Sequence, residues 1–257
     1  MEYLGEILKH LESTTLKEMD QAKLMDRTDT KFVFTSGELM SVIEELSGRY
    51  KVLEIENHRM STYRTLYYDT KDLQLYKQHH NGKLNRYKIR HRTYTESNLG
   101  FLEVKFRSNK GRTIKNRIEI SDVPSQWSEV CTEFLREKTP FDPKDLVPSV
   151  WVSYKRITLV NNENAERITI DTDLEFMYNG VTRKMYDLVI AEVKQYKKSS
   201  SHFLDIMRRR RIHEGSISKY CMAVIMTRPS AKKNNFREKL SSLKHIIYAD
   251  HNTLANC

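Results

Sequence analysis

Glycine, proline and cysteine are scarce in this sequence, and long apolar runs are missing. Eight Gly and five Pro in 257 residues exclude a collagen-like or low-complexity chain. The longest clean apolar run, 221–226, is far shorter than the roughly 18–20 residues that a membrane-spanning helix needs. The first residues form neither a basic nor an apolar signal region. We therefore expect no transmembrane segment and no signal peptide.

The few cysteines also bear on the compartment. Cys131, Cys221 and Cys257 are odd in number and widely separated in the sequence. This pattern is typical of a protein without a disulfide framework, in a reducing environment. We expect a cytoplasmic protein.

Positive charge is present in excess. The chain has 44 Lys and Arg against 34 Asp and Glu, a formal net charge of +10, and its mean hydropathy is −0.67. Such an excess indicates a polyanionic partner, which could be nucleic acid, acidic lipid or a phosphate compound. Composition alone does not choose among these three classes.

The order of predicted elements favours an α+β fold. Apolar periodicity predicts a helix over 5–20 and a second one that begins with the capping box Thr35/Glu38. The remaining helices are predicted at 125–138, 201–212, 217–227 and 236–247, and the strands at 61–70, 86–95, 99–107, 113–120, 150–160, 165–173 and 187–195. Runs of strands without strict alternation with helices predict an antiparallel sheet or barrel. We interpret 1–228 as one domain and 229–257 as a basic tail.

Charged residues recur at alternate positions of six predicted strands. Alternate residues of a strand share one face of the sheet. The aligned positions are Arg86, Lys88, Arg90 and Arg92; Glu103, Lys105 and Arg107; Lys115, Arg117 and Glu119; Tyr154 and Arg156; Arg167, Asp171 and Asp173; and Glu192 and Lys194. The opposite faces are apolar.

Two interpretations fit this pattern. A sheet with one solvated face explains any single strand. The set of six favours strands that close into a barrel whose charged faces line the lumen. Surplus positive charge there carries a large desolvation cost unless water or an anion fills the space. We therefore expect a tunnel for a polyphosphorylated ligand, with a few carboxylates to hold a divalent metal.

Seven short segments, in order, resemble the VTC (vacuolar transporter chaperone) polyphosphate polymerase domain of the triphosphate tunnel metalloenzyme group. They are 26–32, 88–92, 102–105, 154–156, 167–171, 191–194 and 216–220, and the resemblance spans roughly 20–228. It implies an antiparallel eight-stranded β-barrel tunnel with flanking helices. It also implies transfer of the ATP γ-phosphoryl group to a growing polyphosphate chain, with Mn²⁺ or Mg²⁺ as cofactor.

The resemblance also assigns roles to residues. By position, Glu192 matches the metal-holding carboxylate and Tyr154 a hydroxyl that contacts phosphate. With the strand pattern, we predict as catalytic Lys31, Arg90, Arg92, Lys105, Arg156 and Lys194, and as phosphate-binding Arg64, Glu103, Lys115, Arg117, Tyr154, Arg167 and Lys219. Phosphoryl transfer needs such aligned positive charge more than covalent chemistry from the protein.

One departure leaves the reaction open. The paired-Glu motif of the sibling triphosphatases, Glu-x-Glu-x-Lys, is replaced here by Thr28-Asp29-Thr30-Lys31. Fewer carboxylates imply fewer metal ions, which disfavours simple hydrolysis. The alternatives are an inorganic or nucleoside triphosphatase and a non-catalytic module that binds polyphosphate or another polyanion.

The expected partners follow from these hypotheses. They are ATP, inorganic polyphosphate, and pyrophosphate or triphosphate. The sequence contains neither the SPX domain nor the membrane helices of the eukaryotic complexes, which leaves room for a separate membrane partner. Nucleic acid ranks last, since we find no aromatic base-stacking signature on the basic strands.

Overall fold

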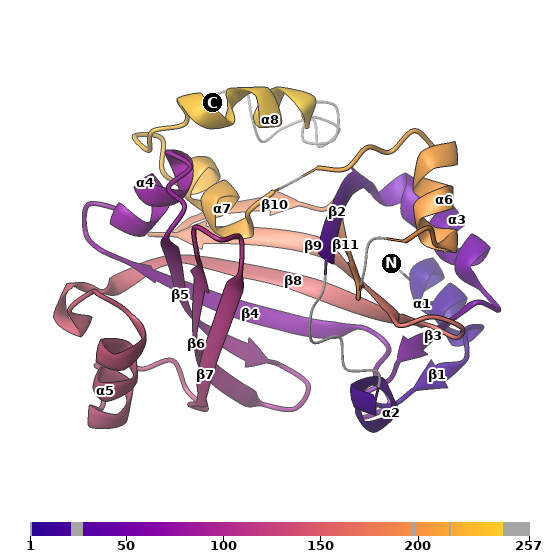
Figure 1. Cartoon of the computed structure of the whole chain (residues 1–257), viewed down its shortest axis with the longest axis horizontal. Helices are drawn as coiled ribbons and strands as arrows, with labels where there is room; N and C mark the ends of the chain where they lie inside the picture. Colours follow the sequence, from indigo (N-terminus) through magenta and orange to yellow (C-terminus); the bar gives the residue numbers. More distant parts are fainter. Residues whose placement is uncertain (1, 22–27, 197–198, 216, 244–257) are drawn as a thin grey trace.

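A single large β-sheet organises the chain in the computed structural model, which describes residues 2–21, 28–196, 199–215 and 217–243 (Figure 1). Its main path runs β2-β11-β9-β8-β4-β5-β6-β7, and all of these neighbours are antiparallel. The strands are β1 (Ser13–Thr14), β2 (Thr28–Thr35), β3 (Tyr50–Leu53), β4 (Ser61–Asp69), β5 (Arg86–Tyr94), β6 (Leu99–Arg107), β7 (Thr113–Glu119), β8 (Val147–Asn161), β9 (Glu166–Tyr178), β10 (Val181–Met185) and β11 (Leu188–Gln195). The α+β class is confirmed.

The sheet is strongly curved but not closed. In the described part of the chain no pairing joins β2 to β7, the two ends of the eight-strand path. The β5–β7 side and the β2–β11 side both come forward from the central strands β8 and β9 (Figure 1). The predicted closed barrel is therefore not observed, because the backbone of these two end strands is not hydrogen-bonded across the gap. The arrangement remains consistent with a tunnel fold.

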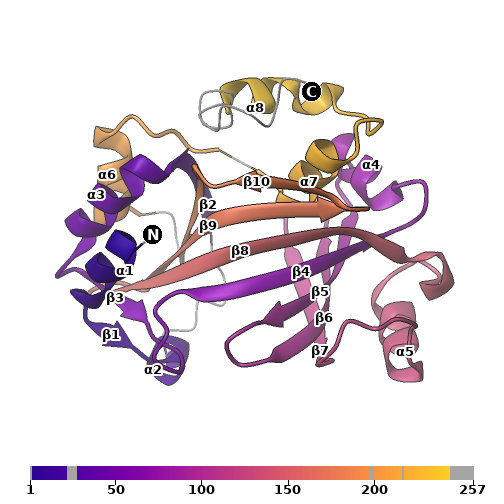
Figure 2. The same ribbon diagram turned by 180° about the vertical axis from the view of Figure 1, so that it is seen from behind.

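Helices cover both faces of the sheet. They are α1 (Glu2–Lys9), α2 (Leu16–Gln21), α3 (Ser36–Leu46), α4 (Gln74–His80), α5 (Glu129–Lys138), α6 (His202–Arg209), α7 (Lys219–Thr227) and α8 (Arg237–Ser242). Buried residues of α1, α3 and α6 pack on the outer face of β2, β9 and β11. α5 packs on the outer face of β4, β5 and β6. α7 packs on the opposite, inner face and is buried from Tyr220 to Thr227 (Figures 1 and 2).

Local sequence signals place several of these elements. α3 begins as predicted, with the Glu38 carboxylate accepting a hydrogen bond from the Thr35 N–H at 3.2 Å. The helix predicted over 5–20 is wrong as a single element, because β1 interrupts it and pairs in parallel with β3. Backbone pairing with β3, which lies outside 5–20, outweighs the helical spacing of the apolar residues at β1. None of the helices in the described ranges is long and apolar enough to cross a membrane.

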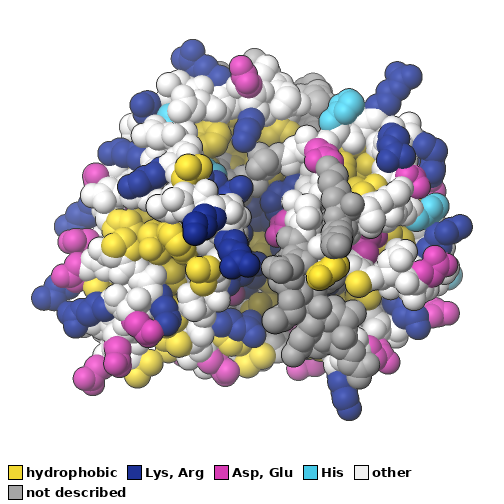
Figure 3. Space-filling model, in the orientation of Figure 1, with side chains coloured by type: hydrophobic (Ala, Val, Ile, Leu, Met, Phe, Trp, Pro, Cys, Tyr) yellow, Lys and Arg dark blue, Asp and Glu magenta, His cyan; other side chains and the backbone are white. Residues whose placement is uncertain are grey.

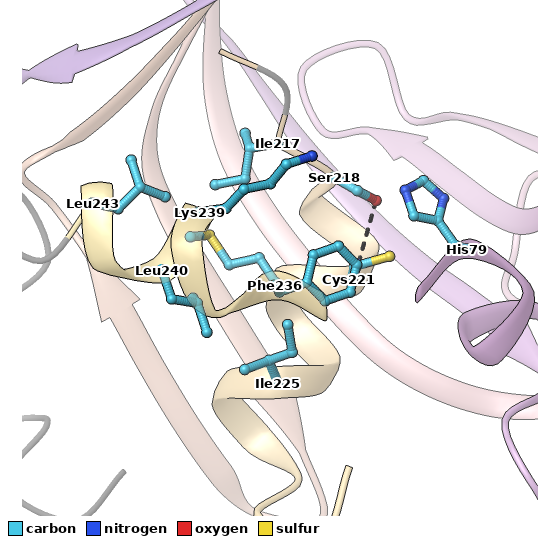
Figure 4. A pocket seen from close by; sticks show the side chains of 10 residues that line it. His79, Ile217, Ser218, Cys221, Ile225, Phe236, Lys239, Leu240 and Leu243 are labelled. Carbon is cyan, nitrogen blue, oxygen red and sulfur yellow. Dashed lines mark hydrogen bonds between the residues drawn. The ribbon is translucent and has the colours of Figure 1, made fainter. Parts of the chain in front are cut away.

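The described part of the basic tail packs on the domain. Phe236 and Leu240 contact the apolar cluster that includes α7, and Leu243 is buried in that cluster. Figure 4 shows side chains of α4, α7 and α8 around a small cavity of about 40 Å³. Residues 229–243 therefore cover α7, and the end of the predicted helix 236–247 lies outside the described residues.

Gly100 is the one glycine whose missing side chain the sheet requires. A Cβ there would collide with the carbonyl oxygens of Ile120 and Ser121, which are backbone atoms at the end of β7. Overpacking of this kind costs about 1–3 kcal/mol. We expect Gly100→Ala to lower the free energy of unfolding by that amount in urea denaturation. The control Gly5→Ala meets no atom in α1 and should be neutral or stabilising; equal effects of both variants would contradict this explanation.

Candidate functional site

Most of the predicted site residues lie on one face of the sheet. We call this the inner face; it carries the alternate positions Lys31, Arg90, Glu103, Asp171 and Glu192. Neighbouring positions such as Ile89, Ile170 and Ala191 point to the outer face, into the cores beneath the helices. Figure 3 shows a hollow on this side of the molecule, with Lys and Arg side chains at its rim and inside it.

The β5–β7 side of the inner face presents its charges in rows. Strand pairing aligns residues of the three strands directly opposite one another. The rows are Lys88–Lys105–Lys115, Arg90–Glu103–Arg117 and Arg92–Phe101–Glu119. Successive rows are two residues apart, which corresponds to about 7 Å along a strand.

Glu103 balances two of these arginines. Its carboxylate accepts a hydrogen bond from Arg90 Nε at 2.6 Å and lies 4.0 Å from Arg92 Nε. Burial opposes ionisation, but Arg90 and Arg92 outweigh it and lower the pKa of Glu103. Arg92 is 9% exposed and its Nε has no hydrogen-bond partner among the described residues. Glu103 therefore satisfies Arg90 but leaves the Nε of the buried Arg92 free to donate a hydrogen bond.

Two lysines of the same side have no carboxylate partner in the described residues. Lys88 donates to the hydroxyl of Ser218 at 2.9 Å, and Lys105 forms no ion pair within the described ranges. Burial, foremost, and neighbouring cations lower the pKa of Lys88 to about 8 and that of Lys105 to about 7. Positive charge is thus concentrated at Lys88 and Lys105, and no carboxylate among the described residues pairs with either lysine.

The β2–β11 side holds a carboxylate between two lysines. Glu192 pairs with Lys31 on the adjacent strand and with Lys194 on its own strand, the latter at 2.9 Å. Burial would raise the pKa of Glu192, but Lys194 and Lys31 lower it well below its usual range. Burial also lowers the pKa of Lys194 to about 8, despite this partner. Both carboxylate oxygens are therefore occupied by ammonium groups.

A second buried pair lies between the two sides. Arg156 of β8 binds Asp171 of β9 through two hydrogen bonds, of 2.6 and 2.9 Å, and Lys219 also pairs with this carboxylate. Arg156 and Lys219 overcome burial and hold the pKa of Asp171 far below its usual range. Both cations also lie over the ring of Tyr154, at 5.3 and 4.6 Å.

The two sides of the sheet face each other across one space. Lys31 of β2 contributes to the lowered pKa of Lys88 on β5, and Glu192 of β11 partly raises that of Lys105 on β6. These strands are at opposite ends of the sheet order, so their charges interact through the hollow. The N-terminus of α7 enters this space as well, because Ser218 caps α7 and contacts Lys88.

The structure brings together most, but not all, of the predicted residues. Arg167 on β9 lies directly opposite Lys194 on β11. Lys115 and Arg117 are exposed on β7. Arg64 is not brought to this cluster: it lies 4.6 Å over the Trp151 ring, on the face of β4 that Leu66 shares. Alternation explains this position, because Tyr63 and Thr65 occupy the inner positions beside it.

A β-bulge corrects a second expectation. Asp173 was expected to share the face of Asp171. The register between β8 and β9 shifts here, and Asp173 has a positive φ of 51°. The extra residue turns Asp173 toward Lys155, 3.2 Å away, and brings Leu174 into the inner core instead.

Aromatic side chains of the inner face were missed in the sequence. Tyr63, Tyr154, Tyr94 and Phe101 form a chain of ring contacts across four strands, with centroids 4.9–5.9 Å apart. These rings contact one another, so they leave untested the expectation that the basic strands lack a base-stacking signature. The signal was present, because Tyr94 and Phe101 occupy the same alternate positions as Arg92 and Glu103.

The donor set does not fit a resident metal ion. Within the described ranges no three His, Cys, Asp or Glu side chains come together. Three of the inner-face carboxylates, Glu103, Asp171 and Glu192, each lie beside two cations instead. A Mg²⁺ or Mn²⁺ ion prefers several oxygen ligands, and most of them would have to come from outside the protein here.

Solved structures share this fold at low sequence identity. HpAC1 from Hippeastrum, described as a candidate adenylyl cyclase with a dominant triphosphatase activity, is 14% identical, with a TM-score of 0.51 over 79% of this chain and 97% of that chain. A candidate adenylate cyclase from Bacillus halodurans is 16% identical, with a TM-score of 0.47 over 76% of this chain and 96% of that chain. Identities this low show a fold only. Among curated proteins there is no match.

The family model supplies the stronger relation. The model described as the VTC domain matches residues 26–227, which include β2 to β11 and all of α7. Every inner-face residue discussed above lies within this range. The chain therefore belongs to the VTC domain family.

Proposed function

We propose that this protein is a polyphosphate polymerase, which transfers the γ-phosphoryl group of ATP to a growing inorganic polyphosphate chain. The observation that carries the proposal is the unbalanced lysine row, Lys88 and Lys105, facing the Lys31–Glu192–Lys194 group across the hollow. Partly buried cations without a carboxylate partner are costly, and a linear polyanion between the two sides would reduce that cost. Membership of the VTC domain family supports the same ligand class.

The chemistry asks for alignment and positive charge. In the transfer, the bond from the γ-phosphorus to the β,γ-bridging oxygen breaks, and a terminal oxygen of the chain forms the new bond; ADP leaves. Charge develops on the bridging oxygen and is spread over the transferring group. Lys88, Lys105 and Arg90 are placed to donate to those oxygens, and the α7 N-terminus at Ser218 favours anions beside them.

The proposal includes the passage of the polymer through the hollow as a tunnel. Arg156 and Lys219, oriented by Asp171, and Arg167 and Lys194 on the neighbouring strands would continue the basic track along it. A divalent ion enters as part of the metal–ATP substrate, with Glu192 as the proposed protein ligand if one of its lysines moves to a phosphate. A membrane partner for the product also remains a proposal.

A triphosphatase of the same fold is the second candidate. The fold is shared with HpAC1, described as having a dominant triphosphatase activity. Such an enzyme would use water as the acceptor in place of the chain end. The missing paired-Glu motif at Thr28-Asp29-Thr30-Lys31 counts against it.

Incubation of pure protein with ATP and Mn²⁺ tests the proposal, with polyphosphate followed on gels and free phosphate measured in the same samples. Wild type should form polymer. Arg92→Met should lower the rate about 100-fold, and it leaves Glu103 paired with Arg90. The control Arg112→Met changes an exposed arginine of the β6–β7 turn and should have no effect. Phosphate release without polymer would favour the triphosphatase, and binding without turnover the non-catalytic module.

The lowered pKa values of Lys88 and Lys105 predict a pH-dependent affinity. A bound phosphate chain favours the protonated lysines, so it raises both pKa values, about 8 and about 7 in the free protein. Binding at pH 8 should therefore take up protons, and the affinity for tripolyphosphate should fall as the pH rises from 7 to 9. Calorimetry in buffers of different ionisation enthalpy measures the uptake; proton release, or an affinity that rises with pH, would contradict this assignment.

A further inference from the structure

Apolar side chains occupy one end of the charged rows that β5 and β6 present on the inner face. Tyr94 ends β5, and Leu99 and Phe101 begin β6. Leu99 is 42% exposed, and Tyr94 and Phe101 are half-buried. Phe101 belongs to none of the three apolar clusters formed by the described residues. Its ring therefore does not serve a core that packing would explain.

Neighbouring rings hold this aromatic end in place. Phe101 meets Tyr94 edge to face at 5.9 Å, and Tyr94 contacts Tyr63 at 4.9 Å. Tyr63 in turn stacks on Tyr154 at 5.1 Å and 9°. On the solvent side, the Arg117 guanidinium lies 4.5 Å from the Phe101 centroid. A flat ligand that stacks on this face of Phe101 must displace Arg117, whose planar guanidinium can then lie over the ligand.

The spacing links this end to the basic rows. Phe101 is directly opposite Arg92, and Arg90 lies in the next row. Lys105 is four residues beyond Phe101 on the same strand, about 13 Å away. This distance is comparable with the length of an extended nucleoside triphosphate. Lys88 and Lys105, which have no carboxylate partner in the described residues, then lie beside the γ-phosphate. This is the end of the triphosphate that carries the most negative charge.

We propose that Phe101, with Tyr94 and Arg117, binds the purine base of ATP by stacking. The inference rests on the proposed function and adds the orientation of the nucleotide. The base lies at the Phe101 end, the α- and β-phosphates pass Arg92 and Arg90, and the γ-phosphate reaches Lys88 and Lys105. The acceptor chain approaches from beyond that row. Phe101 thus favours the binding of nucleotides over inorganic phosphate chains, which have no base to stack.

Comparison of two ligands tests the inference. Dissociation constants are measured by calorimetry for Mg²⁺–ATP and for inorganic tripolyphosphate, which has no base. Stacking of a base on an aromatic side chain contributes about 1–3 kcal/mol, so Phe101→Ala should weaken ATP binding about 5-fold to 100-fold. Its affinity for tripolyphosphate should stay within about twofold of wild type. Phe101→Trp should retain the ATP affinity, since the indole also stacks.

Phe106→Ala is the matched control. Phe106 is a half-buried phenylalanine of the same strand that stacks on Tyr87 at 4.6 Å, on the outer face. It should change neither affinity, and thermal unfolding reports whether either alanine variant has lost its fold. Equal weakening of ATP and tripolyphosphate by Phe101→Ala, or no weakening of either, would overturn the base site. A wild type that binds neither ligand would instead refute the proposed function, and the base site with it.

Discussion

Lys105→Met is expected to stabilise the protein and to lower polyphosphate synthesis about 100-fold. Burial, foremost, and the cations Lys88 and Lys115 penalise the charged ammonium of Lys105, so that its pKa falls to about 7. Methionine keeps the apolar stem and removes that penalty. It also removes a cation from the proposed γ-phosphate position, where such a contact contributes about 100-fold or more to the rate.

The stabilisation should depend on pH in a defined direction. The pKa of Lys105 is lowered from 10.5 in the unfolded chain to about 7 in the folded protein. Below pH 7 the lysine is charged in both states and the penalty is complete. Between pH 7 and 10.5 the unfolded state binds more protons, so this group makes the wild type more stable as the pH rises. The advantage of Lys105→Met should therefore be largest at pH 6 and decrease toward pH 10.

Thermal unfolding and polymer assays measure the two effects together. Each kcal/mol corresponds to about 2–4 °C in Tm for a chain of this size. Lys110→Met, in the exposed β6–β7 turn, is the control and should change neither quantity. A Lys105→Met protein that is less stable than wild type at pH 6 would show that Lys105 is compensated in the free protein. Full activity of the variant would remove Lys105 from the proposed mechanism.

Glu192→Gln should give the second large effect. It should lower the stability of the fold and raise the affinity for tripolyphosphate. The side chain is mostly buried, with 20% of it exposed, and its carboxylate lies between Lys31 and Lys194. Removing one partner of a buried ion pair costs about 3–5 kcal/mol, because the remaining charges are left uncompensated. The same surplus charge should tighten tripolyphosphate binding. Turnover should fall about 100-fold, because the proposed carboxylate ligand for the metal–ATP substrate is lost.

Glu175→Gln provides the comparison. Glu175 pairs with Lys184 at 3.6 Å on the surface, and exposed pairs contribute about 0–1 kcal/mol. It should alter neither Tm nor binding. A Mn²⁺ requirement for activity that rises specifically in Glu192→Gln would support the metal role of Glu192, and an unchanged requirement would leave it a charge-balancing role. Weaker tripolyphosphate binding by Glu192→Gln would contradict the electrostatic argument.

The charged inner face was largely predictable because strand geometry is local. Alternation depends only on the period of two, and it placed Arg90, Lys105 and Glu192 correctly on one face. The same rule predicts the outward position of Arg64, once Tyr63 is recognised as an inner residue. Alternation fails at Asp173, because a bulge adds a residue that no local pattern announces. The sequence of a strand thus determines which face each side chain takes, but pairing with its neighbour determines where a bulge changes that face.

The sequence by itself determined the α+β class, the excess of positive charge and the family to which residues 26–227 belong. These properties follow from composition, periodicity and short motifs. Only the tertiary structure decided which carboxylate balances which cation, that Lys88 and Lys105 have no carboxylate partner among the described residues, and that Phe101 and Tyr94 lie at the far end of the same rows. Such relations join strands that are distant in the chain, and they depend on register and sheet curvature.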